Sequence, residues 1–169
     1  MPSTYTPIAT TTLGSAASSV TFSSISGAYT DLVLVINAGS SSTDNFASVE
    51  LNSDTTSSNY SWTTLYGNGT SAASARATST GYINAYVGIG TGLDSTIISN
   101  FMNYSNATTY KTVLSRTGRA ASGGTYPGTE AMVTLWRNTA AITSIKVKAF
   151  STFNFITGST FTLYGVKNA

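Results

Sequence analysis

Apolar and polar residues alternate with a period of two along much of this chain. Segments 145–149 and 159–166 show the alternation clearly, with apolar residues at every second position and Lys or Thr between them. Neighbouring side chains of a β-strand point to opposite faces, so this period predicts strands with one buried and one wet face. The segment Asp31–Ile36 is apolar on both faces, which is typical of a central strand buried between layers.

Clusters of Gly, Ser, Asn and Pro separate these segments at short intervals and supply the residues that turns require. Thr and β-branched residues fill the segments between them, and no segment shows a sustained helical stripe. Residues 71–77 are the best helix candidate, but they lack large apolar residues and are predicted to be a loop. The pattern predicts strands near residues 5–13, 17–25, 30–38, 47–52, 59–66, 81–89, 95–104, 110–119, 129–138, 142–150 and 159–167.

Many short strands with frequent turns predict an all-β fold, either a sandwich or a barrel. A single-domain antiparallel β-sandwich of two four- or five-stranded sheets fits the mixture of one-faced and two-faced strands. Residues 1–12, with Pro2, Pro7 and a threonine run, predict an extended N-terminal arm before a sandwich domain of residues 13–169. Because a bare strand edge accepts an added strand, this arm is a candidate for docking on a neighbouring subunit.

The composition argues against most enzyme chemistry. The chain of 169 residues has no cysteine and no histidine, which removes thiolate nucleophiles, disulfides and the commonest general base and metal ligand. Its Ser and Thr hydroxyls therefore lack a histidine to activate them. We expect a protein that is not an enzyme and has no cofactor.

Charged residues make up only 8% of the chain, against about 25% in an ordinary soluble domain. The eight basic residues are dispersed, so no nucleic-acid footprint is visible. No apolar run approaches the ~20 residues of a membrane-spanning helix, and the N-terminus has no signal-peptide pattern. We expect a protein made in the cytoplasm that leaves the cell by lysis or as part of a particle.

The acidic residues concentrate in one region, since four of the six lie between residues 31 and 60: Asp31, Asp44, Glu50 and Asp54. Two neighbouring carboxylates are what glycoside hydrolysis requires. However, Glu50 alternates out of phase with Val49 and Leu51, which predicts a position on the solvent face. Asp44 and Asp54 are better interpreted as turn residues that bind backbone amides.

The loop from Asn52 to Asn59 offers oxygen ligands that would suit calcium. It contains a single carboxylate, Asp54, and lacks the spacing of an EF-hand loop. The sequence therefore predicts neither a catalytic residue nor a metal site here.

Aromatic residues are numerous for so polar a chain, with ten tyrosines and two tryptophans. Exposed Tyr and Trp side chains stack on sugar rings or anchor protein interfaces, whereas buried ones pack a sandwich core. Both interpretations stay open from the sequence. The candidate binding residues are Pro2, Tyr5, Pro7, Trp62, Tyr66 and Tyr126.

Four segments together resemble a known family: residues 12–25, residues 29–35, the loop Leu51–Asp54 with Asn59–Ser61, and the ending Gly158–Val166. In this order they resemble small β-sandwich virion proteins of tailed bacteriophages. The resemblance implies a jelly-roll-like sandwich exposed on the surface of the phage particle. It carries no catalytic residues.

Two roles are open within that class. A capsid decoration (cement) protein binds the outer shell as a homotrimer or other homo-oligomer and contacts the major capsid protein. A tail-fibre or receptor-binding module recognises a host surface glycan. The chain begins at Met1 and shows no collagen-like or coiled-coil shaft. This favours decoration, with neither nucleic acid nor membrane as a partner.

Overall fold

The computed structural model describes residues 4–42, 46–84, 89–120 and 128–167. Within them the chain forms strands and a single 3-10 turn, Ser57–Asn59. No helix in these ranges is long and apolar enough to cross a membrane. The strands are β1 (Tyr5–Thr12), β2 (Ser19–Phe22), β3 (Asp31–Ala38), β4 (Ala47–Leu51), β5 (Tyr60–Gly67), β6 (Ala72–Thr80), β7 (Ile83–Asn84), β8 (Ser95–Phe101), β9 (Lys111–Arg119), β10 (Thr129–Trp136), β11 (Ile145–Ala149) and β12 (Thr160–Val166).

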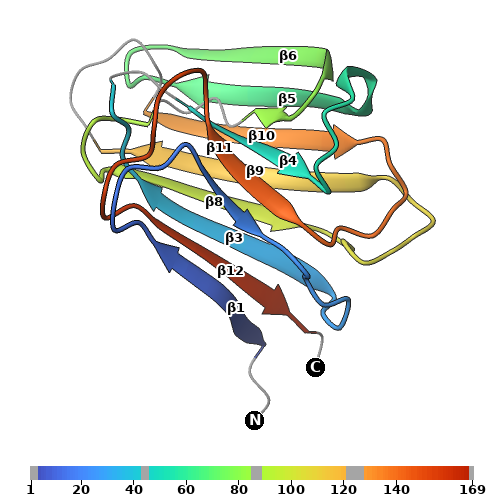
Figure 1. Cartoon of the computed structure of the whole chain (residues 1–169). Helices are drawn as coiled ribbons and strands as arrows, with labels where there is room; N and C mark the ends of the chain where they lie inside the picture. Colours follow the sequence, from blue (N-terminus) through green and yellow to red (C-terminus); the bar gives the residue numbers. More distant parts are fainter. Residues whose placement is uncertain (1–3, 43–45, 85–88, 121–127, 168–169) are drawn as a thin grey trace.

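The strands form two antiparallel sheets of unequal size (Figure 1). The larger has the order β1-β12-β3-β8-β9-β10-β5-β6, and the smaller has the order β2-β11-β4-β7 and crosses in front of it in this view. Their pairing is nested: β1 pairs with β12, β2 with β11, β3 with β8, and β4 with β7. Nested hairpins rolled into two sheets are the jelly-roll arrangement.

The all-β sandwich expected from the sequence is confirmed, but the two sheets are not of similar size. The hairpins β5–β6 and β9–β10 both extend the larger sheet to eight strands, whereas the smaller keeps four. Residues 71–77 were predicted to be a loop, and this prediction is wrong, because Ala72–Thr80 form the edge strand β6. The side chains of β6 are mostly exposed, so this edge strand needs no large apolar residues. A prediction based on apolar alternation therefore does not detect it.

The residues assigned to the N-terminal arm form strand β1 from Tyr5 onward. β1 pairs with β12 of the same chain along its length, and the register shifts between Pro7 and Ala9. A proline and an irregularity are features that discourage further pairing at a sheet edge. β1 is therefore one edge of the larger sheet, and β6 is the other.

The core lies between the two sheets and is centred on β3. Leu32, Leu34 and Ile36 are at most 1% exposed and belong to one apolar cluster with residues of β4 and β11. On the opposite face of β3, Val33 is also buried, at 8% exposure. β3 is therefore apolar on both faces, but only the face of Leu32, Leu34 and Ile36 packs against the smaller sheet. The expectation of a strand buried between two layers holds for that face alone.

Gly165 in β12 permits a close approach that no other residue would allow. A Cβ atom at this position would lie 2.3 Å from Cδ1 of Tyr29, which is far inside van der Waals contact. The Tyr29 ring therefore packs directly on the β12 backbone, and Nζ of Lys167 lies 5.5 Å from its centroid. This contact explains why glycine stands at position 165.

Two leucine substitutions in the larger sheet test this description of the core. We expect Leu34→Ala to lower the free energy of unfolding by about 2–5 kcal/mol, because it leaves a cavity in a packed interior. Leu65→Ala, at a residue that is 65% exposed, should change it by less than about 0.5 kcal/mol. Chemical denaturation measures both, and similar values for the two variants would contradict the assigned core.

Candidate functional site

The Asp54 carboxylate is a hydrogen-bond acceptor that organises the loop between β4 and β5. Oδ1 accepts the backbone N–H of Thr56 at 2.9 Å, while Oδ2 accepts Nδ2 of Asn59 at 2.7 Å and Nε1 of Trp136 at 2.8 Å. Burial raises the pKa of Asp54, but the hydrogen bonds from Asn59, Thr56 and Trp136 outweigh it and lower the pKa to about 2. The prediction that Asp54 is a turn residue is confirmed; Asp44 lies outside the described residues.

Tyr60 ties the same loop to the smaller sheet. Its hydroxyl donates to the backbone oxygen of Asp54 at 3.0 Å and accepts the backbone N–H of Leu51, the last residue of β4, at 3.1 Å. Tyr60 is fully buried, and burial raises the pKa of its hydroxyl. Its ring lies near that of Trp136, with centroids 6.3 Å apart. The loop is thus bonded to both sheets.

Asn52 is the second anchor of the loop. It adopts a left-handed backbone conformation with φ of 51°, which asparagine tolerates better than most residues. Its Oδ1 accepts the backbone N–H groups of Thr143 at 2.8 Å and Ser144 at 3.0 Å, and Nδ2 donates to the oxygen of Ala141 at 2.8 Å. The side-chain oxygens of Asn52 and Asp54, considered as calcium ligands, are therefore engaged by donors of the chain itself. Among the described residues, no group of three acidic, His or Cys residues lies together.

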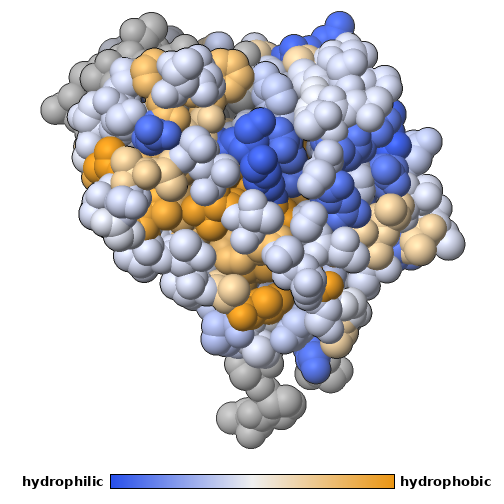
Figure 2. All heavy atoms as spheres, viewed as in Figure 1, coloured by the Kyte–Doolittle hydropathy of each residue, from blue (hydrophilic) through white to orange (hydrophobic). Residues whose placement is uncertain are grey.

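Glu50 does not lie exposed on the solvent face, and the prediction that it does is wrong. It is only 6% exposed and accepts Nζ of Lys148 in an ion pair of 2.6 Å. The alternation places it correctly on the face opposite Val49 and Leu51. However, β4 is an inner strand between β11 and β7, so neighbouring side chains flank it. Figure 2 shows strongly polar residues gathered over the area of β11 and β4.

Glu130 is a buried acid that the sequence pattern did not single out. It is 6% exposed, and Oε1 accepts the hydroxyl of Thr64. Oε2 has no hydrogen-bond partner within the described part of the chain. Burial raises the pKa of Glu130 to about 7, although the Thr64 hydrogen bond opposes the rise. The sequence did contain a signal for this burial, because Glu130 alternates in phase with Met132, whose side chain faces inward.

The outer face of the larger sheet, turned away from the smaller sheet, is covered by no other layer of the described residues. Four large apolar side chains on this face are at least 40% exposed: Tyr5, Leu65, Leu114 and Val133. Three of them lie on the adjacent strands β5, β10 and β9. We call this part of the molecule the outer-face patch and define it by three rows of side chains.

Cross-strand pairing fixes the three rows. The first is Ser74, Leu65, Ala131 and Arg116; the second is Arg76, Thr63, Val133 and Leu114; the third is Thr78, Ser61, Leu135 and Thr112. Nη2 of Arg137 donates to Oγ of Ser61 at 2.8 Å and so adds a third arginine beside the last row. The three rows thus have an apolar centre with arginines around it and contain no acidic residue. Glu130, which also lines a hollow along these strands, belongs to the opposite face of β10.

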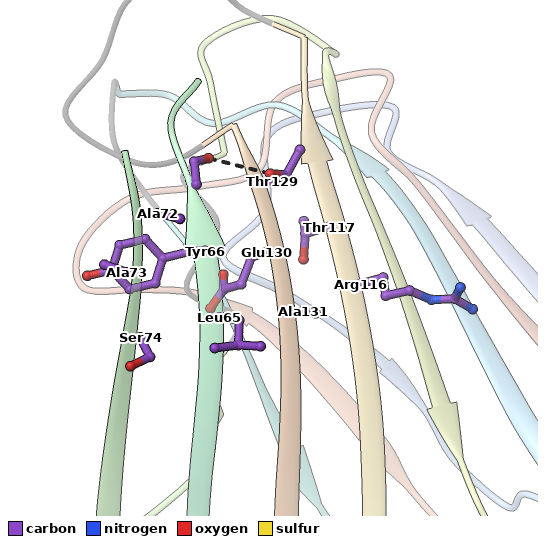
Figure 3. A pocket seen from close by; sticks show the side chains of 11 residues that line it. Leu65, Tyr66, Ala72, Ala73, Ser74, Arg116, Thr117, Thr129, Glu130 and Ala131 are labelled. Atoms are coloured by element: carbon purple, nitrogen blue, oxygen red, sulfur yellow. Dashed lines mark hydrogen bonds between the residues drawn. The ribbon is translucent and has the colours of Figure 1, made fainter. Parts of the chain in front are cut away.

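Two hollows lie along these strands. The larger has a volume of about 790 Å³ and is lined by residues that include Leu65, Tyr66, Arg116, Glu130 and Ala131. Figure 3 shows Leu65 and Glu130 among the lining side chains, and Arg116 extending from β9 away from them. The smaller, of about 220 Å³, lies beside Arg76, Val133 and Leu135. The patch is therefore uneven, with hollows between raised side chains.

The structure does not bring the predicted binding residues together. Tyr5 and Pro7 are exposed on β1, where Tyr5 makes an edge contact with Tyr164 at 6.4 Å, whereas Tyr66 lines the larger hollow near the opposite edge of the sheet. Trp62 is only 5% exposed, so its ring packs in the interior and offers no stacking surface. Pro2 and Tyr126 lie outside the described residues.

Comparison with known proteins adds no further information on the patch. No protein-family model and no curated protein matches this chain.

Asp54→Asn tests the loop anchor. We expect the variant to lose about 1–3 kcal/mol of unfolding free energy at neutral pH, because three donors lose a charged acceptor. The lowered pKa means that the wild-type contribution is present above pH 3.8 and is lost as pH falls toward 2, so the variant should lose less stability there. Denaturant titrations across this range measure both effects. Asp31→Asn, which removes one charged acceptor for the Asn103 N–H, is the control and should cost less.

Glu130→Gln tests the buried acid through its pH dependence. Because the pKa rises from 4.5 to about 7 on folding, the folded state holds a proton that the unfolded state has released between these values. Wild-type stability should therefore fall as pH rises through this window, while that of Glu130→Gln should not. Thermal melts at several pH values measure the difference, and parallel curves for both proteins would contradict it.

Proposed function

We propose that this chain is a non-enzymatic bacteriophage virion structural protein, a capsid decoration protein that binds the outer shell as a homo-oligomer. The observation that supports this best is the outer-face patch. A contiguous apolar area with a polar rim on a soluble protein marks an interaction surface. Leu65, Val133 and Leu114 form such an area on the outer face of the larger sheet, which nothing in the described part of the chain covers.

The rest of the surface suits a particle component. Because charged residues are few, contacts with partners rely on shape, hydroxyl hydrogen bonds and aromatic anchors. The jelly-roll arrangement is shared by viral capsid domains and lectins, which supports the proposal by analogy only. The exposed Tyr5 and Pro7 on the β1 edge remain candidates for contacts between subunits.

A receptor-binding module that recognises a host glycan is the second candidate. The larger hollow favours it, because Tyr66 lines this hollow and aromatic rings stack on sugars. Trp62 has no part in this alternative, since its ring is buried.

The location of the protein on purified particles tests the first candidate. We expect quantitative mass spectrometry to find it in a copy number that scales with the major capsid protein. Electron microscopy of labelled particles should place it on the shell. A copy number that scales with a tail protein would contradict decoration, and absence from particles would contradict a virion role.

Sedimentation of the isolated protein with host cell-wall polysaccharide tests the second candidate. If that candidate holds, Tyr66→Ala should weaken binding about tenfold or more, within the range known for aromatic anchors. Tyr110→Ala is the matched control, because Tyr110 is a 55% exposed tyrosine away from the hollow. Equal loss in both variants would count against the hollow as a glycan site.

A further inference from the structure

We propose that the outer-face patch docks a different protein, one that presents carboxylates around an apolar centre, and not a second copy of this chain. The inference rests on the proposed function and identifies the partner as the major capsid protein. Its basis is the distribution of charge over the two sides of the larger sheet.

The arginines of the patch are available to a partner. Arg76 on β6 and Arg116 on β9 are exposed, and neither forms a hydrogen bond or ion pair within the described part of the chain. They lie in adjacent rows on opposite sides of Leu65 and Val133. Arg137 is held at the third row by Oγ of Ser61 and by the backbone oxygen of Ser58 at 3.4 Å. A planar guanidinium binds a carboxylate with two parallel hydrogen bonds, so this patch is suited to acidic groups.

A second copy is poorly matched to this surface. Each of the five described acidic residues already interacts with a donor of its own chain: Asp31 with Asn103, Glu50 with Lys148, Asp54 with Trp136, Asp94 with Ser95, and Glu130 with Thr64. None of these residues belongs to the rows of the patch. Glu130 lines the larger hollow, but it is only 6% exposed and is bonded to Thr64. Two patches facing each other would therefore bring arginines against arginines, which is repulsive.

The apolar centre distinguishes a protein partner from a purely anionic polymer. Leu65 is 65% exposed and Val133 is 49% exposed, and both stand between the arginines. An apolar centre with a polar rim and enrichment of arginine is the composition of protein interfaces. The complementary surface carries apolar side chains opposite Leu65 and Val133 and carboxylates opposite the arginines.

Binding to purified capsid shells assembled without this protein tests the inference. We expect the double variant Arg76→Glu with Arg116→Glu, and separately Leu65→Ser, to bind shells at least about tenfold more weakly than wild type. Wild-type binding should weaken as salt rises, and the double variant should lose this salt dependence. Circular dichroism melts establish that each variant is folded.

Lys146→Glu is the control, because Lys146 lies on β11 in the smaller sheet and undergoes one such charge reversal away from the patch. It should bind shells like wild type. If wild type binds and the arginine variant binds equally well, the patch is not the docking surface, although the proposed function stands. If wild type itself does not bind shells, the proposed function fails and the assigned partner fails with it.

Sedimentation velocity of the proteins without shells tests whether the patch instead binds a second copy of this chain. We expect the oligomeric state of the arginine variant to equal that of wild type. An oligomer that dissociates in this variant would make the second copy the occupant and overturn the proposal. Loss of shell binding in the arginine variant with no loss in Leu65→Ser would also overturn it, because contact would then be electrostatic alone.

Discussion

The carboxylate of Asp54 is the interaction on which the junction of the two sheets depends. The chain leaves the smaller sheet at Leu51 and enters the larger sheet at Tyr60, and Asp54 lies between them. Its bonds to Trp136 and Asn59, with the two bonds of the Tyr60 hydroxyl, fix this crossing in one geometry. A charged acceptor surrounded by donors is a strong anchor in a chain that otherwise relies on neutral hydroxyl and amide groups.

The unequal size of the sheets determines which surfaces are free. Four strands of the smaller sheet pack the core, while the hairpins β5–β6 and β9–β10 widen the larger sheet. The additional width places Leu65, Val133 and Leu114 on a face that nothing in the described chain covers. No acidic residue stands in the three rows of this face, and Glu50 and Glu130 are buried, which leaves the face basic and apolar. The apolar and basic character of this face therefore depends on the strand order as well as on the residues that the chain contains.

The sequence predicts features that depend on local pattern and misses those that depend on tertiary packing. Alternation of apolar residues identifies the all-β class, the unbroken apolar run of residues 31–36 identifies the interior strand β3, and turn chemistry identifies the role of Asp54. Alternation does not identify β6, because edge strands need no apolar face. Nor can it reveal that Glu50 is covered by neighbouring strands, that Trp62 is buried, or that arginines from β6 and β9 flank one apolar centre. Those features arise from pairings between residues far apart in the chain.

The nested strand pairing has a consequence for how the protein is made. Tyr5 pairs with Val166, so the first strand finds its partner only after the ribosome has synthesised the last. Contacts between residues so distant in sequence are slow to form, because a long loop must close before they stabilise the chain. During synthesis β12 is therefore absent from its place beside β3, and the apolar edge of β3 is open to other chains. Folding of this protein is consequently vulnerable to aggregation at high expression, and the hydroxyl-rich surface with few apolar runs limits that risk.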